Sequence, residues 1–229
     1  MNDNKKVCVI VPFYNEEEVL EKVLTELIAN NYQVLAVDDG STDKSNEIAR
    51  NLNCVLLKHP SNFGQGAALQ TGISFARLNP KIEYFVTFDS DGQHQVSDIN
   101  NVLIPLVNGE TDFVFGTRFQ DDNTKFPFLK RIVLKAAIKY TQLSTGVAIT
   151  DTHNGFRAFN KLAANIINLN FSGMTHASEF VEKAGQSGLN IKEVPVHILY
   201  TKYTKRKGQS LWNSVNILFE YLTYMHFPE

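Results

Sequence analysis

Strand-like and helix-like segments alternate four times in the first 94 residues of this chain. The strand-like segments cover residues 7–13, 34–37, 54–57 and 84–88, and they consist largely of β-branched and other apolar residues. Segments with apolar residues at helical spacing follow each of the first three. Alternation of this kind predicts right-handed βαβ units around a largely parallel sheet.

Each strand-like segment ends in a polar cluster. The clusters cover residues 15–16, 38–43, 62–66 and 89–94. Ligands bind to open parallel sheets at the carboxyl ends of the strands. The first half of the chain is therefore predicted to form a nucleotide-type cleft.

The second half is less regular. It contains a strand-like segment at 112–115, helical periodicity at 128–143, a polar loop at 151–157, a helix-like segment at 178–186 and a strand-like segment at 191–199. Pro195 in the last of these favours an edge strand or a bulge. A basic segment at 202–207 and an aromatic-rich tail at 211–227 follow.

The composition is that of one ordinary globular domain. The chain has 229 residues, of which 43% are hydrophobic, and 22 Lys and Arg against 24 Asp and Glu give a net charge of −2. No basic excess points to nucleic acid. Cys8 and Cys54 lie in apolar segments, which favours buried thiols in a reducing compartment. With no export signal and no apolar run long enough to span a bilayer, a cytoplasmic location is predicted.

Two carboxylates separated by one residue follow the fourth strand. Asp89 and Asp91 offer hard oxygen ligands, and such a pair typically holds Mg²⁺ or Mn²⁺ that also binds phosphate oxygens. Gln93 and His94 come next and could add a ligand or orient the carboxylates. An Asp- and Gly-rich turn without metal is the alternative, but the position at a strand end favours the metal site.

The second and third clusters suit a nucleotide. Asp39 ends the second strand, where a carboxylate can accept from a ribose hydroxyl or a base N–H; a turn with a helix cap is the alternative. Gly64 and Gly66 precede a helix, which suits close approach to phosphate. The chain has no G-x-G-x-x-G after the first strand and no G-x-x-x-x-G-K-[ST]. These are the main signatures of Rossmann dehydrogenases and P-loop NTPases, so their absence argues against both classes.

The clusters together resemble a known family. The segments VPFYNE (11–16), VDDGSTD (37–43), NFGQG (62–66) and DSDGQH (89–94) occur in this order. They resemble the inverting family 2 glycosyltransferases of GT-A fold, in particular the dolichyl- and polyprenyl-phosphate sugar synthases. GTRF (116–119) and NGFR (154–157) are similar to further signatures of that subgroup, so the resemblance covers most of residues 7–210.

The resemblance implies a fold and a domain organisation. The fold would be α/β, a GT-A type Rossmann-like α/β/α sandwich with a mostly parallel central sheet. The catalytic domain would cover residues 1–210, with a nucleotide-binding half over about 1–95 and an acceptor half over about 96–210. An amphipathic aromatic helix would cover residues 211–229.

Site residues are carried over by their match to the motifs. The donor would be a GDP- or UDP-linked sugar, bound by Pro12, Tyr14, Glu16, Asp39, Asp89, Ser90, Arg118, Arg131, Arg157 and Lys207. The metal ligands would be Asp89, Asp91 and Gln93, with Asp91 also catalytic. Arginine suits contacts to a diphosphate or an acceptor phosphate, and a solvated surface charge is the alternative for each. Gln65 stands where the family often has Lys.

The implied reaction is a single displacement at the anomeric carbon, with the metal neutralising the leaving nucleoside diphosphate. A polyprenyl phosphate is already anionic and needs little base, whereas the hydroxyl of a glycan acceptor needs a general base. His176 and Glu179 are the candidates for that base, because their spacing places them on one helix face. A helix cap and an exposed acid are the alternatives.

Two other functions compete with this one. A sugar-1-phosphate nucleotidyltransferase should have a Gly-rich basic loop after the first strand, which residues 12–16 do not supply. A non-catalytic nucleotide-sugar-binding partner subunit is disfavoured by the intact carboxylate pair. The basic segment and aromatic tail favour peripheral association with the inner face of the cell membrane, or cover for the domain's own core or a homodimer partner.

Overall fold

The computed structural model describes residues 3–118, 139, 142, 147, 149–152, 154–173, 175–199 and 203. The strands are β1 (Val7–Phe13), β2 (Gln33–Asp38), β3 (Val55–Lys58), β4 (Tyr84–Thr87), β5 (Phe113–Thr117), β6 (Arg157–Asn160) and β7 (Ile191–Pro195). The helices are α1 (Leu20–Ala29), α2 (Ser45–Arg50), α3 (Gln65–Arg77), α4 (Asp98–Val107), α6 (Lys161–Ile166) and α7 (His176–Gln186), with a 3₁₀ turn η1 (Asn4–Lys6).

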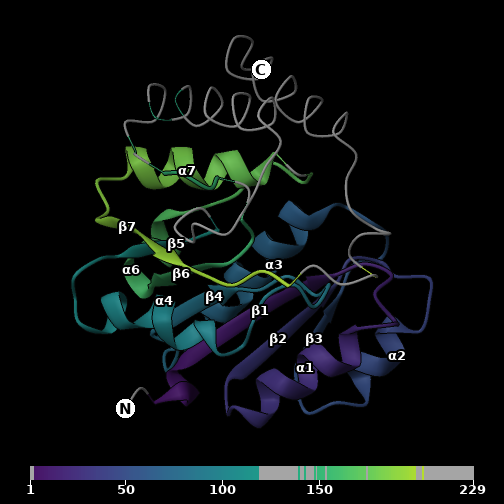
Figure 1. The fold of residues 1–229 in the computed structure, drawn as a ribbon. Helices are drawn as coiled ribbons and strands as arrows, with labels where there is room; N and C mark the ends of the chain where they lie inside the picture. Colours follow the sequence, from purple (N-terminus) through teal and green to yellow (C-terminus); the bar gives the residue numbers. More distant parts are fainter. Residues whose placement is uncertain are drawn as a thin grey trace.

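These strands form one sheet in the order β3-β2-β1-β4-β6-β5-β7 (Figure 1). β1 lies parallel to β2 and β4, β2 to β3, and β5 to β7, whereas β6 runs antiparallel to both β4 and β5. The predicted α/β class with a mostly parallel sheet is confirmed. β7 is an edge strand, as Pro195 indicated.

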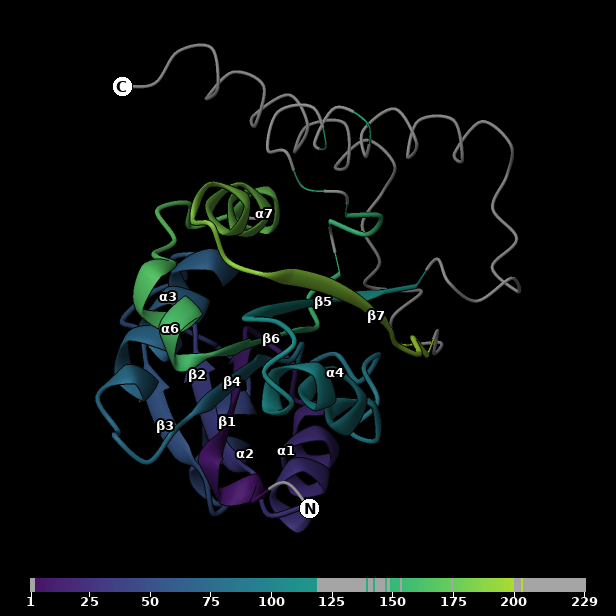
Figure 2. The ribbon, with the colours of Figure 1, turned by 90° about the vertical axis from the view of Figure 1, so that its left-hand side faces the viewer.

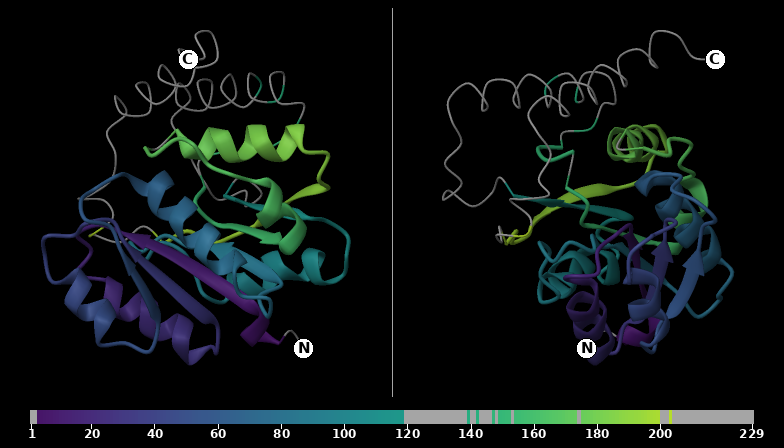
Figure 3. Two further views of the ribbon diagram at one scale, coloured as in Figure 1. Left: turned by 180° about the vertical axis from the view of Figure 1, so that it is seen from behind. Right: turned by 90° about the vertical axis from the view of Figure 1, so that its right-hand side faces the viewer.

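Helices cover both faces of the sheet (Figures 2 and 3), so β1 is buried along its whole length. Val9 and Val11 pack in the core that α1 and α4 close, while Cys8 and Ile10 pack in the core under α3, α6 and α7. Burial of one such aliphatic side chain stabilises the fold by roughly 1.5–3 kcal/mol. Two apolar layers around one sheet give the α/β/α sandwich.

The structure differs from the sequence prediction at several element boundaries. α1 begins at Leu20, not near residues 16–18; the residues just before it form a turn, in which Glu16 N donates to Ser45 Oγ at 2.8 Å and Glu17 N to Asp43 Oδ2 at 3.2 Å. α4, α6 and β6 were not predicted. The loop predicted at 151–157 ends where β6 begins, at Arg157.

Other sequence predictions have mixed outcomes. Cys8 is buried, but Cys54 is only half-buried. Within the described ranges, no helix is both long and apolar enough to cross a membrane. Three predicted segments lie outside the described residues: the helix at 128–143 apart from residues 139 and 142, the segment at 202–207 apart from Tyr203, and the tail at 211–227.

Candidate active site

The site lies at the C-terminal ends of the parallel strands β1, β2 and β4. β1 and β4 run side by side, with Ile10 opposite Thr87, and Thr87 in turn lies opposite Arg157. Because β6 is antiparallel, its first residue lies beside the last residue of β4. Asp89 and Asp91, which follow β4, are therefore brought to the polar loop that precedes β6.

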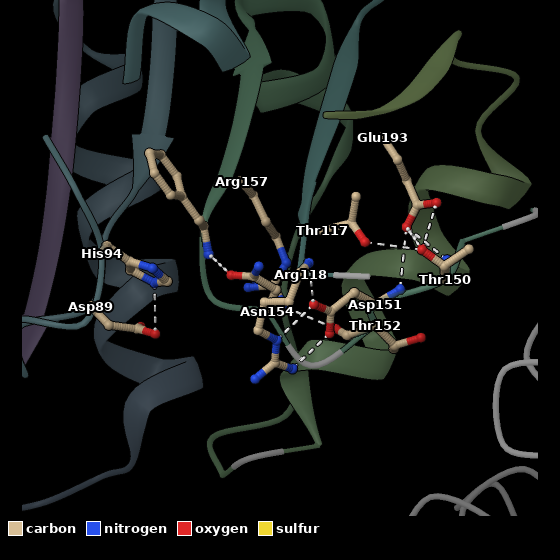
Figure 4. Close-up of polar contacts among 11 residues, drawn as sticks. Asp89, His94, Thr117, Arg118, Thr150, Asp151, Thr152, Asn154, Arg157 and Glu193 are labelled. Atoms are coloured by element: carbon tan, nitrogen blue, oxygen red, sulfur yellow. Dashed lines mark hydrogen bonds and ion pairs between the residues drawn. The ribbon is translucent and has the colours of Figure 1, made fainter. Parts of the chain in front are cut away.

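The carboxylate of Asp89 is held by two donors. Gln65 Nε2, at the start of α3, donates to Oδ1 at 2.8 Å. His94 Nε2 donates to Oδ2 at 3.0 Å (Figure 4). A Cβ atom at Gly155 would lie only 2.2 Å from Oδ2, so the glycine makes room for the carboxylate. The Asp89 side chain still keeps 29% of its surface exposed. This carboxylate is fixed in place and open on one side.

Asp91 is positioned by its own turn. Gln93 donates to it twice, from the backbone N to Oδ1 at 3.0 Å and from Nε2 to Oδ2 at 2.6 Å. Burial and the negative charge of Asp89 raise the pKa of Asp91. Burial also acts to raise the pKa of Asp89, but the hydrogen bond from His94 and the charges of His94, Arg157 and His176 leave it below its usual value. The two carboxylates therefore repel each other.

A divalent cation fits this pair of carboxylates. It would relieve the repulsion that raises the pKa of Asp91, and two carboxylates leave coordination positions for phosphate oxygens and water, as Mg²⁺ prefers. The described ranges contain no group of three or more His, Cys, Asp or Glu arranged to hold a metal ion. Gln93, expected as a third ligand, donates to Asp91 through Nε2, and Ser90 between the carboxylates is buried.

His94 is fixed by aromatic rings as well as by Asp89. Its ring centroid lies 5.3 Å from that of Phe88 and 5.0 Å from that of Phe156. Because a carboxylate only accepts, Nε2 carries the proton shared with Asp89; Nδ1 is buried without a hydrogen-bond partner. These contacts fix the ring, so His94 orients Asp89.

The turn after β4 is also bound to the segment after β7, because Leu199 N donates to Gln93 O at 2.9 Å.

Arg157 is a buried cation behind the carboxylates. Its side chain is fully buried, its guanidinium lies 4.7 Å from the centre of the Phe180 ring, and Nη2 donates to Thr152 O at 3.2 Å (Figure 4). Nε and Nη1, like Nδ2 of Asn154, have no hydrogen-bond partner. Burial lowers the pKa of Arg157 to about 10, against the opposing charges of Asp89 and Asp151. The solvated-surface alternative is therefore wrong for this arginine.

Arg118 belongs to a second polar cluster. Its Nε and Nη2 donate to the two carboxylate oxygens of Asp151, each at 2.7 Å, in the fork geometry typical of arginine and carboxylate. Glu193 Oε1 accepts from Thr150 N at 2.6 Å and from Asp151 N at 3.2 Å, so β7 holds the same loop (Figure 4). Asp151 and Glu193 were not predicted as site residues, because their partners are distant in the chain.

The residues expected around the nucleoside lie at the end of β1. Pro12 is buried in the strand, and Tyr14, just after it, is 41% exposed. Glu16 accepts a hydrogen bond from the hydroxyl of Tyr203, which brings that late residue to the loop after β1. Asn15 has a positive φ of 54°, and its Oδ1 accepts from Thr42 N at 2.8 Å, so the loops after β1 and β2 are joined.

Asp39 is more constrained than the sequence indicated. Its Oδ1 is hydrogen-bonded to His59 Nδ1 at 2.8 Å and accepts from Phe63 N at 3.0 Å, while Oδ2 accepts from Gly64 N at 2.7 Å. Sequence analysis missed His59. The available signal was its position directly after β3, at the same edge of the sheet.

The glycine-rich loop does not offer the expected phosphate site at the start of α3. Ser172 O accepts from Gly66 N at 2.8 Å and from Ala67 N at 3.4 Å. A Cβ at Gly64 would lie 2.2 Å from Ser172 O, and one at Gly66 would lie 2.0 Å from Phe171 O. These glycines allow another segment of backbone to cross the helix start, and a carbonyl fills the place expected for phosphate.

Comparison with known proteins identifies the family. Residues 8–165 match the sequence profile described as Glycosyl transferase family 2. This chain is a member of that family. An uncharacterized Methanocaldococcus jannaschii protein is 37% identical, with 94% of this chain and 90% of the relative covered. The UDP-N-acetylglucosamine–dolichyl-phosphate N-acetylglucosaminyltransferase of Methanococcus voltae is 31% identical, with 96% of each covered.

Solved structures support the fold of this glycosyltransferase. Glucosyl-3-phosphoglycerate synthase of Mycobacterium tuberculosis, crystallised with Mn²⁺, UDP and glucosyl-3-phosphoglycerate, superposes with a TM-score of 0.69 at 18% identity. The match covers 96% of this chain and 78% of the other. The predicted GT-A fold is confirmed.

The expected base candidates of the glycosyltransferase are bound to the backbone. Glu179 is 2% exposed, accepts from Asn170 N at 2.7 Å and Phe171 N at 3.0 Å, and forms an ion pair with Lys183 at 3.0 Å. His176 is also buried, and its Nδ1 donates to Gly173 O at 2.7 Å. A general base must reach the proton it removes. This geometry favours structural roles for both, and Glu179 is not the exposed acid of the alternative.

Two further candidates are not placed by the structure. Arg131 and Lys207, both expected at a phosphate, lie outside the described residues.

Proposed function

We propose that this chain transfers a sugar from a UDP-linked donor to a polyprenyl phosphate, with inversion at the anomeric carbon and with Mg²⁺ or Mn²⁺ held by Asp89 and Asp91. The observation that carries the proposal is the carboxylate pair fixed at the carboxyl edge by Gln65, His94 and Gln93. The names of the relatives support the acceptor: besides the Methanococcus voltae enzyme, a Mycolicibacterium smegmatis polyprenol monophosphomannose synthase is 26% identical over 93% of this chain.

Each residue around the carboxylate pair has a separate role in the proposed reaction. The cation, when bound, neutralises the diphosphate as it leaves. Asp89 and Asp91 would hold that cation, and Gln65, His94 and Gln93 keep their carboxylates oriented so that little reorganisation is needed. An oxygen of the acceptor phosphate attacks the anomeric carbon, and the bond from that carbon to the oxygen of UDP breaks.

The buried positions of His176 and Glu179 support an anionic acceptor. A phosphate oxygen needs no proton removed before it attacks, whereas a sugar hydroxyl does. Both base candidates already donate to or accept from the backbone of residues 170–173. We therefore favour the polyprenyl phosphate over a glycan hydroxyl.

The test is a transfer assay with purified protein and a short-chain polyprenyl phosphate in detergent. Radiolabelled UDP-N-acetylglucosamine, UDP-glucose and GDP-mannose are supplied in turn, with Mn²⁺, Mg²⁺ or EDTA. We expect lipid-linked product from one UDP-sugar, lost with EDTA and reduced at least 100-fold in Asp91→Asn. Glu110→Gln, an exposed carboxylate paired with Lys192, is the matched control and should keep full activity.

The same assay separates the competing functions. Lipid product from GDP-mannose alone would correct the donor, and product that persists in EDTA would exclude the metal. Release of pyrophosphate from UTP and a sugar 1-phosphate would indicate the nucleotidyltransferase. Nucleotide binding without turnover of any donor would indicate the non-catalytic partner subunit.

Contact with a membrane follows from the proposed acceptor, because polyprenyl chains reside in bilayers. We propose peripheral association at the inner face of the cell membrane, supported by the basic residues at 205–207 and the aromatic tail. Flotation with anionic vesicles should carry the full chain upward, and 0.5 M salt should release it. The homodimer stays a prediction from sequence.

A further inference from the structure

A buried histidine links α3 to the loop that carries Asp39. His59 Nδ1 lies 2.8 Å from Asp39 Oδ1, and His59 Nε2 lies 2.9 Å from Thr71 Oγ1. Because a carboxylate only accepts, Nδ1 carries the proton toward Asp39, and Nε2 is then able to accept from the Thr71 hydroxyl. The ring is nearly buried, and its centroid lies 5.3 Å from that of Phe63. One rotamer of His59 satisfies both partners.

The Asp39 carboxylate is held by three donors from this chain. Oδ1 accepts from His59 Nδ1 and from Phe63 N, and Oδ2 accepts from Gly64 N at 2.7 Å. A carboxylate has about four acceptor positions, so one remains, on Oδ2. The backbone donors come from a loop that Gly64 fixes against Ser172, while His59 is the one side chain among the three donors.

We propose that His59 is a positioning residue of the nucleoside site: it orients the Asp39 carboxylate so that the remaining acceptor position of Oδ2 faces the base. This inference rests on the proposed function, which places the donor nucleotide at this edge of the sheet. An acceptor at that point pairs with a ring N–H, which uracil and guanine carry and cytosine lacks. His59 thereby contributes to both nucleotide affinity and discrimination against cytidine.

Two substitutions at one position separate the two hydrogen bonds. The amide nitrogen of Asn overlays the Nδ1 of histidine, so His59→Asn keeps the donor to Asp39 and gives up Thr71. The longer His59→Gln overlays Nε2, so it keeps the partner at Thr71 and leaves Asp39 without its side-chain donor. Thr71→Val preserves side-chain shape and removes only the hydroxyl that fixes the ring.

The experiment is calorimetric titration of the wild type and the three variants with UDP, GDP and CDP in the presence of Mn²⁺, with melting temperatures measured in parallel. The wild type should bind UDP at least tenfold more tightly than CDP. In His59→Gln the dissociation constant for UDP should rise about tenfold or more and the preference over CDP should shrink. In His59→Asn and Thr71→Val, which both keep the donor to Asp39, the dissociation constant for UDP should remain within about threefold of wild type.

The outcomes distinguish failure of the role of His59 from failure of the proposed function on which it rests. A wild type that binds no nucleotide refutes the proposed function and removes the basis of the inference. A wild type that binds UDP while His59→Gln keeps the same affinity and the same UDP-to-CDP ratio overturns the role of His59 alone. Equal losses of melting temperature in the Asn and Gln variants, with unchanged base preference, would show that His59 only holds the loop.

Discussion

Substitution of Gly155 by alanine should displace the Asp89 carboxylate. The added Cβ would lie 2.2 Å from Oδ2, 2.5 Å from Oδ1 and 2.6 Å from Cγ of Asp89. An ordinary carbon–oxygen contact is about 3.3–3.6 Å, so the carboxylate must move by roughly 1 Å. Gly155 itself cannot retreat easily, because its carbonyl accepts a 2.6 Å hydrogen bond from Thr87 Oγ1 in β4.

A shift of that size breaks the hydrogen bonds that orient Asp89. The bonds from Gln65 and His94 measure 2.8 and 3.0 Å, and a further 1 Å takes either beyond hydrogen-bond length. Overpacking in a filled site costs about 1–3 kcal/mol, which lowers the melting temperature by roughly 2–12 °C in a chain of this size. A 1 Å misplacement at a reacting centre costs ~10²-fold in rate.

Gly173→Ala provides the matched control, because a Cβ there meets no atom within 4 Å. Its stability should remain within about 0.5 kcal/mol of wild type. The assay is thermal unfolding together with Mn²⁺ titration in the presence of UDP, followed by turnover well below the melting temperature. If Gly155→Ala matches Gly173→Ala in all three measurements, the reasoning about Asp89 is refuted.

Two further substitutions test the roles of the Glu179 and Glu193 carboxylates. Glu179→Gln should lose about 1–3 kcal/mol of stability, because one backbone N–H of residues 170–171 then faces an amide NH₂, while turnover of the folded variant stays within about threefold of wild type. A 100-fold loss of turnover with unchanged urea unfolding would show that Glu179 acts as the general base. Burial, with the charge of Asp151 adding to it, raises the pKa of Glu193, so the folded state holds that proton more tightly than the unfolded chain. The stabilisation is present at low pH and fades as the pH rises above the usual value of 4.5 through the raised folded value. The difference in unfolding free energy between wild type and Glu193→Gln should therefore shift against wild type from pH 4 to pH 7, and a constant difference would contradict this.

Local sequence patterns predicted the part of the fold in which strands and helices alternate. β1 to β4 and the helices α1 to α3 follow from apolar runs and helical spacing, and the carboxylate pair follows from its place after β4. α1 was predicted to begin too early: the residues before it form a turn that is bonded to Asp43, in the loop after β2, and to Ser45, the first residue of α2. Such contacts are invisible to a pattern that considers one segment at a time.

The contacts that complete the site depend on the direction of β6, which no local pattern reveals. Had β6 been parallel to β4, its first residue would lie at the opposite edge of the sheet, far from Asp89. The antiparallel register instead places Arg157 opposite Thr87 and puts Gly155 against the carboxylate. A side chain at position 155 is therefore excluded by a residue of a different motif. The segments at 89–94 and 154–157 act as one structural unit, so a change in either should be judged by its effect on Asp89.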